Sequence, residues 1–177
     1  MTIDWILPSP NAKTCNVGVL LGCGNGTFAN QTTYSTGDGS NPRSVAVGDF
    51  NNDTRLDIVV ANSGTNNVGI LLGYGNGTFA NQATFSTGDG SRPYSVAVID
   101  FNNDNRSDIA VANSGTVNIV ILFGDGNGTF ANSTSFSIGY DSQPYSVAVG
   151  DFDEDSSTDI AVANYGTNDV EILSKKC

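Results

Sequence analysis

The chain has 177 residues, of which 18 are acidic and 7 are basic, and it contains no histidine. Its formal net charge of −11 argues against nucleic-acid partners and anionic membrane surfaces, because both would repel such a surface. Without histidine the chain lacks the commonest general base and a common zinc ligand. A charged fraction of only 14% and 21 glycines are unlike the composition of a helical protein, so helices are not expected.

No run of 18 apolar residues is present, so we expect no insertion into a membrane. Residues 1–13 lack a basic segment followed by an apolar one, and they are not predicted to be a signal peptide. The three cysteines, Cys15, Cys23 and Cys177, cannot all pair within one chain. Their spacing leaves open whether Cys15 and Cys23 form a disulfide across a hairpin or stay free.

An internal repeat of 51 residues dominates the sequence. The string Ser-Val-Ala-Val begins at residues 44, 95 and 146, and Gly-Asn-Gly-Thr-Phe begins at residues 24, 75 and 126. Such self-similarity indicates an architecture in which each unit packs on its neighbours. It divides one domain into a partial N-terminal unit with an irregular start, two whole units and a partial C-terminal unit, at residues 1–43, 44–94, 95–145 and 146–177.

Taken in chain order, the first predicted strand is a degenerate one at residues 4–7, displaced by two residues from the repeat register. Two more follow at 17–21 and about 32–35. Each whole unit then has four short strands, named a to d, which in the first unit lie at residues 44–47, 58–61, 68–72 and about 83–86. The last predicted strand is 170–173. Turn clusters of Gly, Asn and Asp separate the strands, and no helical periodicity is present.

A four-stranded antiparallel meander every 51 residues predicts an all-β fold, a β-propeller with stacked blades. A β-solenoid is the alternative, but its coils repeat at well under half this length. The strands add up to about 3.5 blades, whereas propellers have roughly four to eight. This count is compatible with a partial ring within a longer chain, with an irregular closed ring of four blades, or with two copies that complete one ring by self-association.

The loop between strands a and b is acidic in every unit. Counted from its first residue, side-chain oxygens occupy positions 1, 3, 5 and 9, and position 7 offers a backbone carbonyl. Calcium takes six to eight hard oxygen ligands, and ligands at alternate residues can all point into a curled loop. We therefore predict three Ca²⁺ sites. Their ligands would be Asp49, Asn51, Asp53, Arg55 and Asp57 in the first loop, Asp100, Asn102, Asp104, Arg106 and Asp108 in the second, and Asp151, Asp153, Asp155, Ser157 and Asp159 in the third.

An EF-hand and a metal-free turn both fit the acidic loops less well. An EF-hand needs Gly at position 6 and Glu at position 12, where the first loop has Thr54 and Val60. Asp and Asn also favour turns without any metal. That does not easily account for three or four aspartates within nine residues of each loop, because these charges repel one another when no cation is bound.

The string VAVGDFNNDTRLDIVVAN, followed by NVGILLGYGNGTF, resembles the FG-GAP/VCBS repeat, whose family includes the N-terminal propeller of integrin α chains. The resemblance covers nearly all of residues 16–173 and recurs three times. It implies a seven-bladed type of propeller that binds calcium through positions 1, 3, 5 and 9 of the a–b loop. The family's usual Gly at position 6 is replaced by Thr54, Asn105 and Ser156, of which Asn best tolerates a left-handed conformation.

These features predict a non-catalytic calcium-binding propeller module for protein or glycan binding and adhesion, in which calcium is structural. A lectin is one alternative, because Tyr94 and Tyr145 lie just before two of the a strands and could line a ligand face, although packing between blades is the simpler role. Another is a non-catalytic piece of a larger secreted enzyme or receptor. No catalytic residue is predicted, since the carboxylates recur equally in every unit. Weak calcium affinity would suit an extracellular or secreted protein.

Overall fold

The computed structural model describes residues 3–8, as backbone, and residues 15–174. The described residues form strands and loops without a helix, so none could cross a membrane as a helix. The strands are β1 (Ile3–Pro8), β2 (Asn16–Leu21), β3 (Thr32–Ser35), β4 (Pro42–Gly48), β5 (Asp57–Asn62), β6 (Asn67–Leu71), β7 (Ala83–Ser86), β8 (Pro93–Ile99), β9 (Asp108–Asn113), β10 (Asn118–Gly124), β11 (Phe130–Ser137), β12 (Pro144–Gly150), β13 (Asp159–Asn164) and β14 (Asp169–Leu173).

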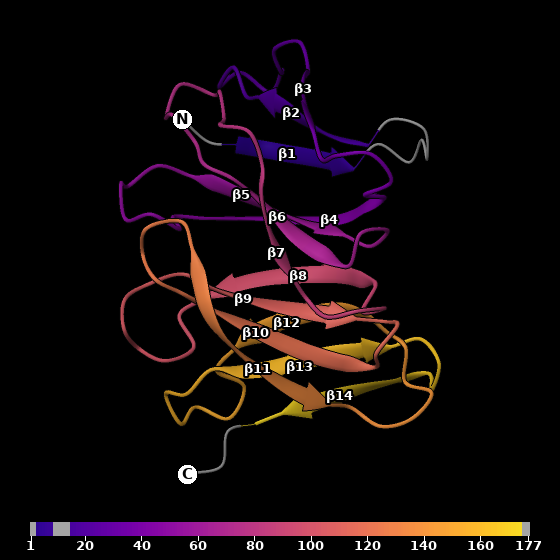
Figure 1. The fold of residues 1–177 in the computed structure, drawn as a ribbon. Coiled ribbons are helices and arrows are strands. Elements are labelled where there is room, and N and C mark those ends of the chain that lie inside the picture. Colours follow the sequence, from indigo (N-terminus) through magenta and orange to yellow (C-terminus); the bar gives the residue numbers. More distant parts are fainter. Residues whose placement is uncertain (1–2, 9–14, 175–177) are drawn as a thin grey trace.

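The strands form four antiparallel sheets, each a meander of consecutive strands. The first sheet is β1-β2-β3, the second β4-β5-β6-β7, the third β8-β9-β10-β11 and the fourth β12-β13-β14. Figure 1 shows them stacked in chain order, with the first and fourth sheets at opposite ends of an open row. The predicted all-β propeller-like architecture is therefore confirmed as a partial ring, and not as a closed ring of four blades.

Burial of the strands explains their composition. In the second sheet, β5 is buried along its whole length, because neighbouring sheets cover both of its faces. A strand buried on both faces needs a continuous apolar run, and β5 has one in Ile58–Ala61. The outer strand β7 is mostly exposed and alternates polar with apolar residues. The core therefore lies between the sheets, and each sheet depends on its neighbours to bury its apolar side chains.

Serine at the start of each Ser-Val-Ala-Val string joins neighbouring inner strands. The Ser44 hydroxyl oxygen accepts a hydrogen bond from the backbone N–H of Val96 at 3.3 Å. In the same way the Ser95 hydroxyl accepts one from the N–H of Val147 at 3.2 Å. Each contact crosses from one repeat to the equivalent strand of the next. A short side chain here lets the inner strands β4, β8 and β12 lie close together.

The Gly-Asn-Gly-Thr-Phe strings form tight hairpin turns. In the second sheet both glycines, Gly75 and Gly77, have positive φ angles, of 76° and 85°. Between them the Asn76 side-chain oxygen accepts hydrogen bonds from the N–H and the hydroxyl of Thr78, at 3.0 and 2.7 Å. The hairpin lies close to the acidic loop of the same unit.

The structure lengthens several predicted strands. Strand a begins two residues earlier than predicted, at Pro42, and a bulge between Pro42 and Ser44 shifts the register. In the third sheet, the ladder between β10 and β11 extends as far as the Gly124–Phe130 pair at the hairpin. The equivalent pair of the second sheet, Gly73–Phe79, is an isolated bridge. Cys15 and Cys23 are free thiols, and Cys177 lies outside the described residues.

Candidate metal loops

Each acidic loop joins an inner strand to the second strand of the same sheet. The first runs from Asp49, just after β4, to Asp57, the first residue of β5. The second and third loops follow β8 and β12 in the same way. Since these inner strands are equivalent in the repeat, all three loops emerge at the same end of their sheets. All of the metal ligands predicted from the sequence lie in this one kind of loop.

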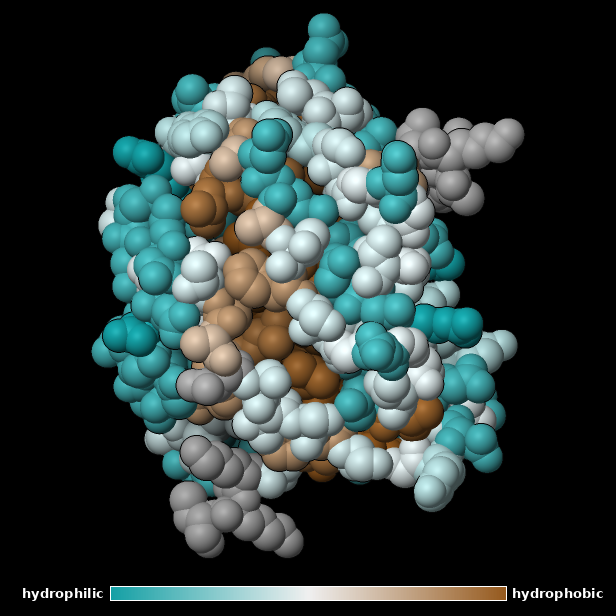
Figure 2. Space-filling model, in the orientation of Figure 1, coloured by the Kyte–Doolittle hydropathy of each residue, from teal (hydrophilic) through white to brown (hydrophobic). Residues whose placement is uncertain are grey.

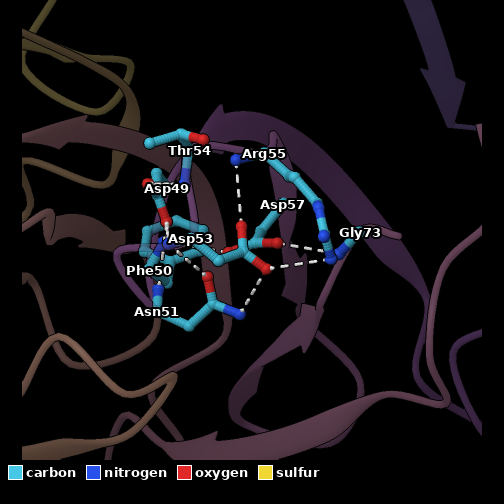
Figure 3. A network of polar contacts seen from close by, with 8 residues as sticks. All are labelled: Asp49, Phe50, Asn51, Asp53, Thr54, Arg55, Asp57 and Gly73. Carbon is cyan, nitrogen blue, oxygen red and sulfur yellow. Dashed lines mark hydrogen bonds and ion pairs between the residues drawn. The ribbon is translucent and has the colours of Figure 1, made fainter. Parts of the chain in front are cut away.

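Backbone N–H groups hold the carboxylates of the first loop in place (Figure 3). The Asp49 carboxylate accepts hydrogen bonds from the N–H groups of Asp53, at 3.2 Å, and Thr54, at 2.8 Å. Asp53 in turn accepts one from the N–H of Arg55 at 2.9 Å. The loop therefore curls around its own carboxylates, and it brings positions 1, 3 and 5 together on one side.

The residues at position 7 lie beside the position-5 carboxylates in all three loops. Arg106 donates its backbone N–H to Asp104 at 2.9 Å, and Ser157 donates its own to Asp155 at 2.7 Å. The guanidinium groups of the two arginines also approach these carboxylates, at 3.6 Å in the Arg55–Asp53 pair and 3.9 Å in the second loop. These side chains are about half exposed, so the ion pairs contribute little to stability.

The aspartate at position 9 has a structural role that its place in the repeat did not predict. Asp57 is fully buried, and its two oxygens accept hydrogen bonds from the N–H groups of Phe50, at 2.9 Å, and Gly73, at 2.7 Å. Phe50 lies at the start of the loop, whereas Gly73 belongs to the c–d hairpin. Asp57 therefore fastens the start of the acidic loop to the c–d hairpin, and each oxygen keeps a lone pair for a cation.

The second repeat has the same fastening, and the third shows one of its two hydrogen bonds among the described residues. Asp108 accepts hydrogen bonds from Phe101 at 2.9 Å and from Gly124 at 2.8 Å. Asp159 accepts one from Phe152 at 2.9 Å, and the position equivalent to the second donor falls at residue 175, outside the described residues. The signal for this role is present in the sequence, because a glycine follows sixteen residues after the aspartate in both whole units.

Burial raises the pKa of the Asp57 carboxyl above its ordinary value of 3.8, because desolvation disfavours the charged form. The two backbone hydrogen bonds act in the opposite direction, and the nearby carboxylates of Asp53 and Asp49 raise the pKa further. The pKa of Asp108 is raised for the same reasons. A divalent cation would counteract both the desolvation and the repulsion from nearby carboxylates, since it favours the charged form of every carboxylate near it.

The third loop has the densest group of carboxylates. One oxygen each of Asp151, Asp153 and Asp159 lies within 4.8 Å of the others. Desolvation, followed by the charges of Asp155 and Asp159, raises the pKa of Asp153. Elsewhere in the described part of the chain no such group of three is found. The first two loops differ because position 3 is asparagine in them.

Asparagine at position 3 partly occupies the place of a carboxylate. The Asn51 amide donates a hydrogen bond to the side chain of Asp53 at 3.1 Å, and Asn102 does the same to Asp104. Because the amide is uncharged, it adds none of the repulsion that a carboxylate at position 3 would create. The oxygen of each amide remains a possible ligand for a hard cation.

Left-handed backbone at position 6 curls each loop. The φ angles are 65° at Thr54, 63° at Asn105 and 68° at Ser156. A positive φ is uncommon for any residue other than glycine and is a marked outlier for β-branched threonine. The loops therefore keep the left-handed conformation at the position where the family usually has glycine. This costs backbone strain, which is largest at Thr54.

The three loops offer carboxylate, amide and carbonyl oxygens, and no sulfur or imidazole donor. Oxygen-only donors of this kind fit a hard cation such as Ca²⁺ and do not fit zinc or copper. Ligands at alternate positions of a short curled loop also fit the flexible geometry of calcium better than the strict octahedron of magnesium. The loops are thus chemically suited to bind calcium.

A second polar surface lies at the other end of the inner strands. It is an open groove of about 930 Å³ whose lining includes Arg43, Arg92, Tyr94 and Tyr145. The Tyr94 and Tyr145 rings stack with centroids 4.2 Å apart, and the guanidinium of Arg43 lies 5.0 Å above the Tyr94 ring. Tyr165 extends the stack at 4.9 Å from Tyr145. Tyr94 and Tyr145 therefore stack across neighbouring sheets and also border the groove.

Comparison with known proteins identifies the repeat. The family model for the FG-GAP-like repeat matches residues 4–60, 49–111 and 100–162. No curated protein matches the chain. Among solved structures, virginiamycin B lyase from Staphylococcus aureus superposes with a TM-score of 0.60 at 13% identity, covering 94% of this chain and 50% of the lyase.

Two further solved structures superpose in a similar way. The Photorhabdus luminescens Tc holotoxin pore does so with a TM-score of 0.55 at 16% identity, covering 94% of this chain and 8% of that one. The third is BBS1N in complex with ARL6DN, with a TM-score of 0.52 at 15% identity, covering 92% of this chain and 50% of that one. At such identities the likeness concerns the fold alone. The chain spans half or less of the length of these structures.

Proposed function

The chain belongs to the FG-GAP-like repeat family, and from that premise we propose that it is a non-catalytic calcium-binding module that binds a protein or glycan partner outside the cell. The observation that carries the calcium part is the group of Asp151, Asp153 and Asp159 oxygens within 4.8 Å of one another. Three carboxylates at such distances repel one another strongly unless a cation lies among them. The two other loops repeat the same backbone turn and the same aspartates at positions 1, 5 and 9, with asparagine at position 3.

Calcium would act structurally in this proposal. Each loop is tied to its sheet through the position-9 aspartate, so a cation in the loop would fix the a and b strands and the c–d hairpin together. Calcium that binds the folded chain and not the unfolded chain raises the free energy of unfolding by mass action. Three bound ions would also offset six of the eleven excess negative charges.

The test is a thermal melt of the chain in EDTA and in excess calcium, followed by circular dichroism. We expect calcium to raise the melting temperature by several degrees and EDTA to reverse the gain. In the variant Asp153→Asn the calcium-dependent gain should shrink, whereas Asp89→Asn, which removes an exposed carboxylate outside the loops, should leave it unchanged. A melting temperature that is the same in EDTA and calcium would refute the calcium proposal.

The groove beside the tyrosine stack favours a lectin-like function as the second candidate. The two arginines that line it, Arg43 and Arg92, have no ion pair among the described residues, whereas the other two arginines pair with loop aspartates. Guanidinium groups next to aromatic rings suit carboxylate-bearing ligands, because Arg binds carboxylates in a two-pronged geometry. An acidic oligosaccharide is therefore the ligand class we propose for this candidate.

Calorimetric titration with oligogalacturonate, compared with a neutral galactose oligomer, tests the lectin-like candidate. Binding of the acidic glycan alone, lost in Arg43→Gln/Arg92→Gln, would support it. The matched control is Arg55→Gln/Arg106→Gln, which removes two arginines at the opposite end of the sheets. No binding, equal binding of both glycans, or equal loss in the two double variants would count against the groove as the ligand site.

A further inference from the structure

The outward face of the fourth sheet exposes apolar side chains that the repeat otherwise buries. On β14, Val170 is 67% exposed and Ile172 is 49% exposed. The equivalent residues of the third sheet, Ile119 and Ile121, are 0% and 2% exposed. Ala163 of β13 is likewise exposed, whereas its counterpart one repeat earlier is fully buried. Figure 2 shows apolar surface continuing toward the end of the molecule where this sheet lies.

The chain itself shows what covers such a face. On the third sheet, Ile119 and Ile121 pack in one cluster with Val147, Ile160 and Val162 of the fourth sheet. The second sheet repeats this arrangement against the third. In both cases one face of a sheet meets the opposite face of the next sheet in the chain. The fourth sheet therefore has the apolar face that a further sheet of the same repeat would cover.

The first sheet, at the other end of the row, presents the complementary face. Val17 and Val19 of β2 are buried against the second sheet. Side chains alternate along a strand, so Leu20 belongs to the opposite face, where it is only half buried. Its backbone partner across the ladder is Trp5 of β1, which is the only tryptophan in the chain.

We propose that two copies of this chain associate head to tail, with the fourth sheet of each copy on the first sheet of the other. The two contacts would be identical and related by a two-fold axis, so that they close a ring. Four sheets from each copy make eight, which is within the range of four to eight blades that propellers use. This inference rests on the sheets and is independent of calcium and of the groove.

Sedimentation velocity combined with Trp5 fluorescence tests the proposal on the full chain. We expect a concentration-dependent dimer whose Trp5 emission shifts to the blue as the dimer forms. The double variant Val170→Asp/Ile172→Asp should weaken dimerisation at least tenfold and abolish that shift, although its changes lie at the far end of its own chain from Trp5. Both side chains are exposed in a single copy, so the variant should keep the circular dichroism of the parent.

The control Thr84→Asp adds a charge to the exposed outer strand β7 and should leave dimerisation unchanged. If the double variant unfolds, Ile172→Asn alone provides the same comparison. A parent that stays monomeric at every concentration would overturn the proposal, as would a dimer that survives the double variant. A dimer that is lost without any change in Trp5 emission would show that two fourth sheets meet each other instead. Longer polymers would show that the contact does not close.

Discussion

Replacement of Asp57 by asparagine separates its structural role from calcium binding. Both oxygens of Asp57 accept buried backbone N–H groups, whereas asparagine has one accepting oxygen and turns an NH₂ group toward the other donor. Removal of one acceptor so that a buried N–H has no partner costs about 1–3 kcal/mol, and more where the lost acceptor was charged. The raised pKa of Asp57 shows that burial of its charge offsets part of this. We therefore expect Asp57→Asn to lower the free energy of unfolding by about 2–3 kcal/mol.

Urea denaturation in EDTA, where no calcium is bound, measures this effect. The matched variant is Asp53→Asn, because that side chain is part of an open loop and accepts its backbone hydrogen bond from Arg55 near the surface. In EDTA it should change the free energy of unfolding by less than about 1 kcal/mol, and in calcium it should reduce the gain from the ion. An Asp57→Asn variant within about 0.5 kcal/mol of the parent in EDTA would refute the structural role of this side chain.

Three further predictions concern pH, close packing and the ends of the row. The folded-state pKa values of Asp57 and Asp108 are raised, so these groups bind protons more tightly in the folded than in the unfolded chain. The calcium-free chain should therefore gain stability as the pH falls from 7 toward 4, while the gain from calcium shrinks; thermal melts in EDTA and calcium across this range measure both. Gly115→Ala would place a methyl group 2.0 Å from a backbone carbonyl oxygen, and it should cost about 1–3 kcal/mol by urea denaturation. Ile121→Ala should cost about 2–5 kcal/mol, whereas Ile172→Ala should cost less than about 1 kcal/mol in dilute monomer, because only Ile121 is buried; equal losses would contradict this.

The architecture follows from features that are local in the sequence. Alternating or continuous apolar runs fix the strands, and Gly-Asn-Gly strings fix the hairpins, so the four-strand meander could be predicted without knowledge of distant contacts. The bulge after Pro42 and the longer ladder of β11 were not predicted, because both depend on register between paired strands. Whether the row closes depends on angles between sheets, which a repeat length does not encode.

The acidic loops show a similar division. Their residues and their spacing were evident from the sequence, since Asp and Asn recur at fixed positions. The role of Asp57 as a fastening for Gly73 was not, because the partner lies sixteen residues away and uses its backbone. The difference between the third loop and the other two is visible in the sequence, because position 3 is Asp153 there and asparagine in the others. The hydrogen bond from the Asn51 amide to Asp53 was not evident from the sequence.

The open row of sheets has a consequence for how the molecule folds and fails. Each sheet contacts only the next, so the fold is close to a one-dimensional array with nearest-neighbour cooperativity. In a single copy, the outermost sheets of the described residues have three strands each and one neighbour each, which makes them the least protected against local opening. Unfolding should then proceed from the ends inward, and amide exchange should be slowest in the fully buried strands β5 and β9.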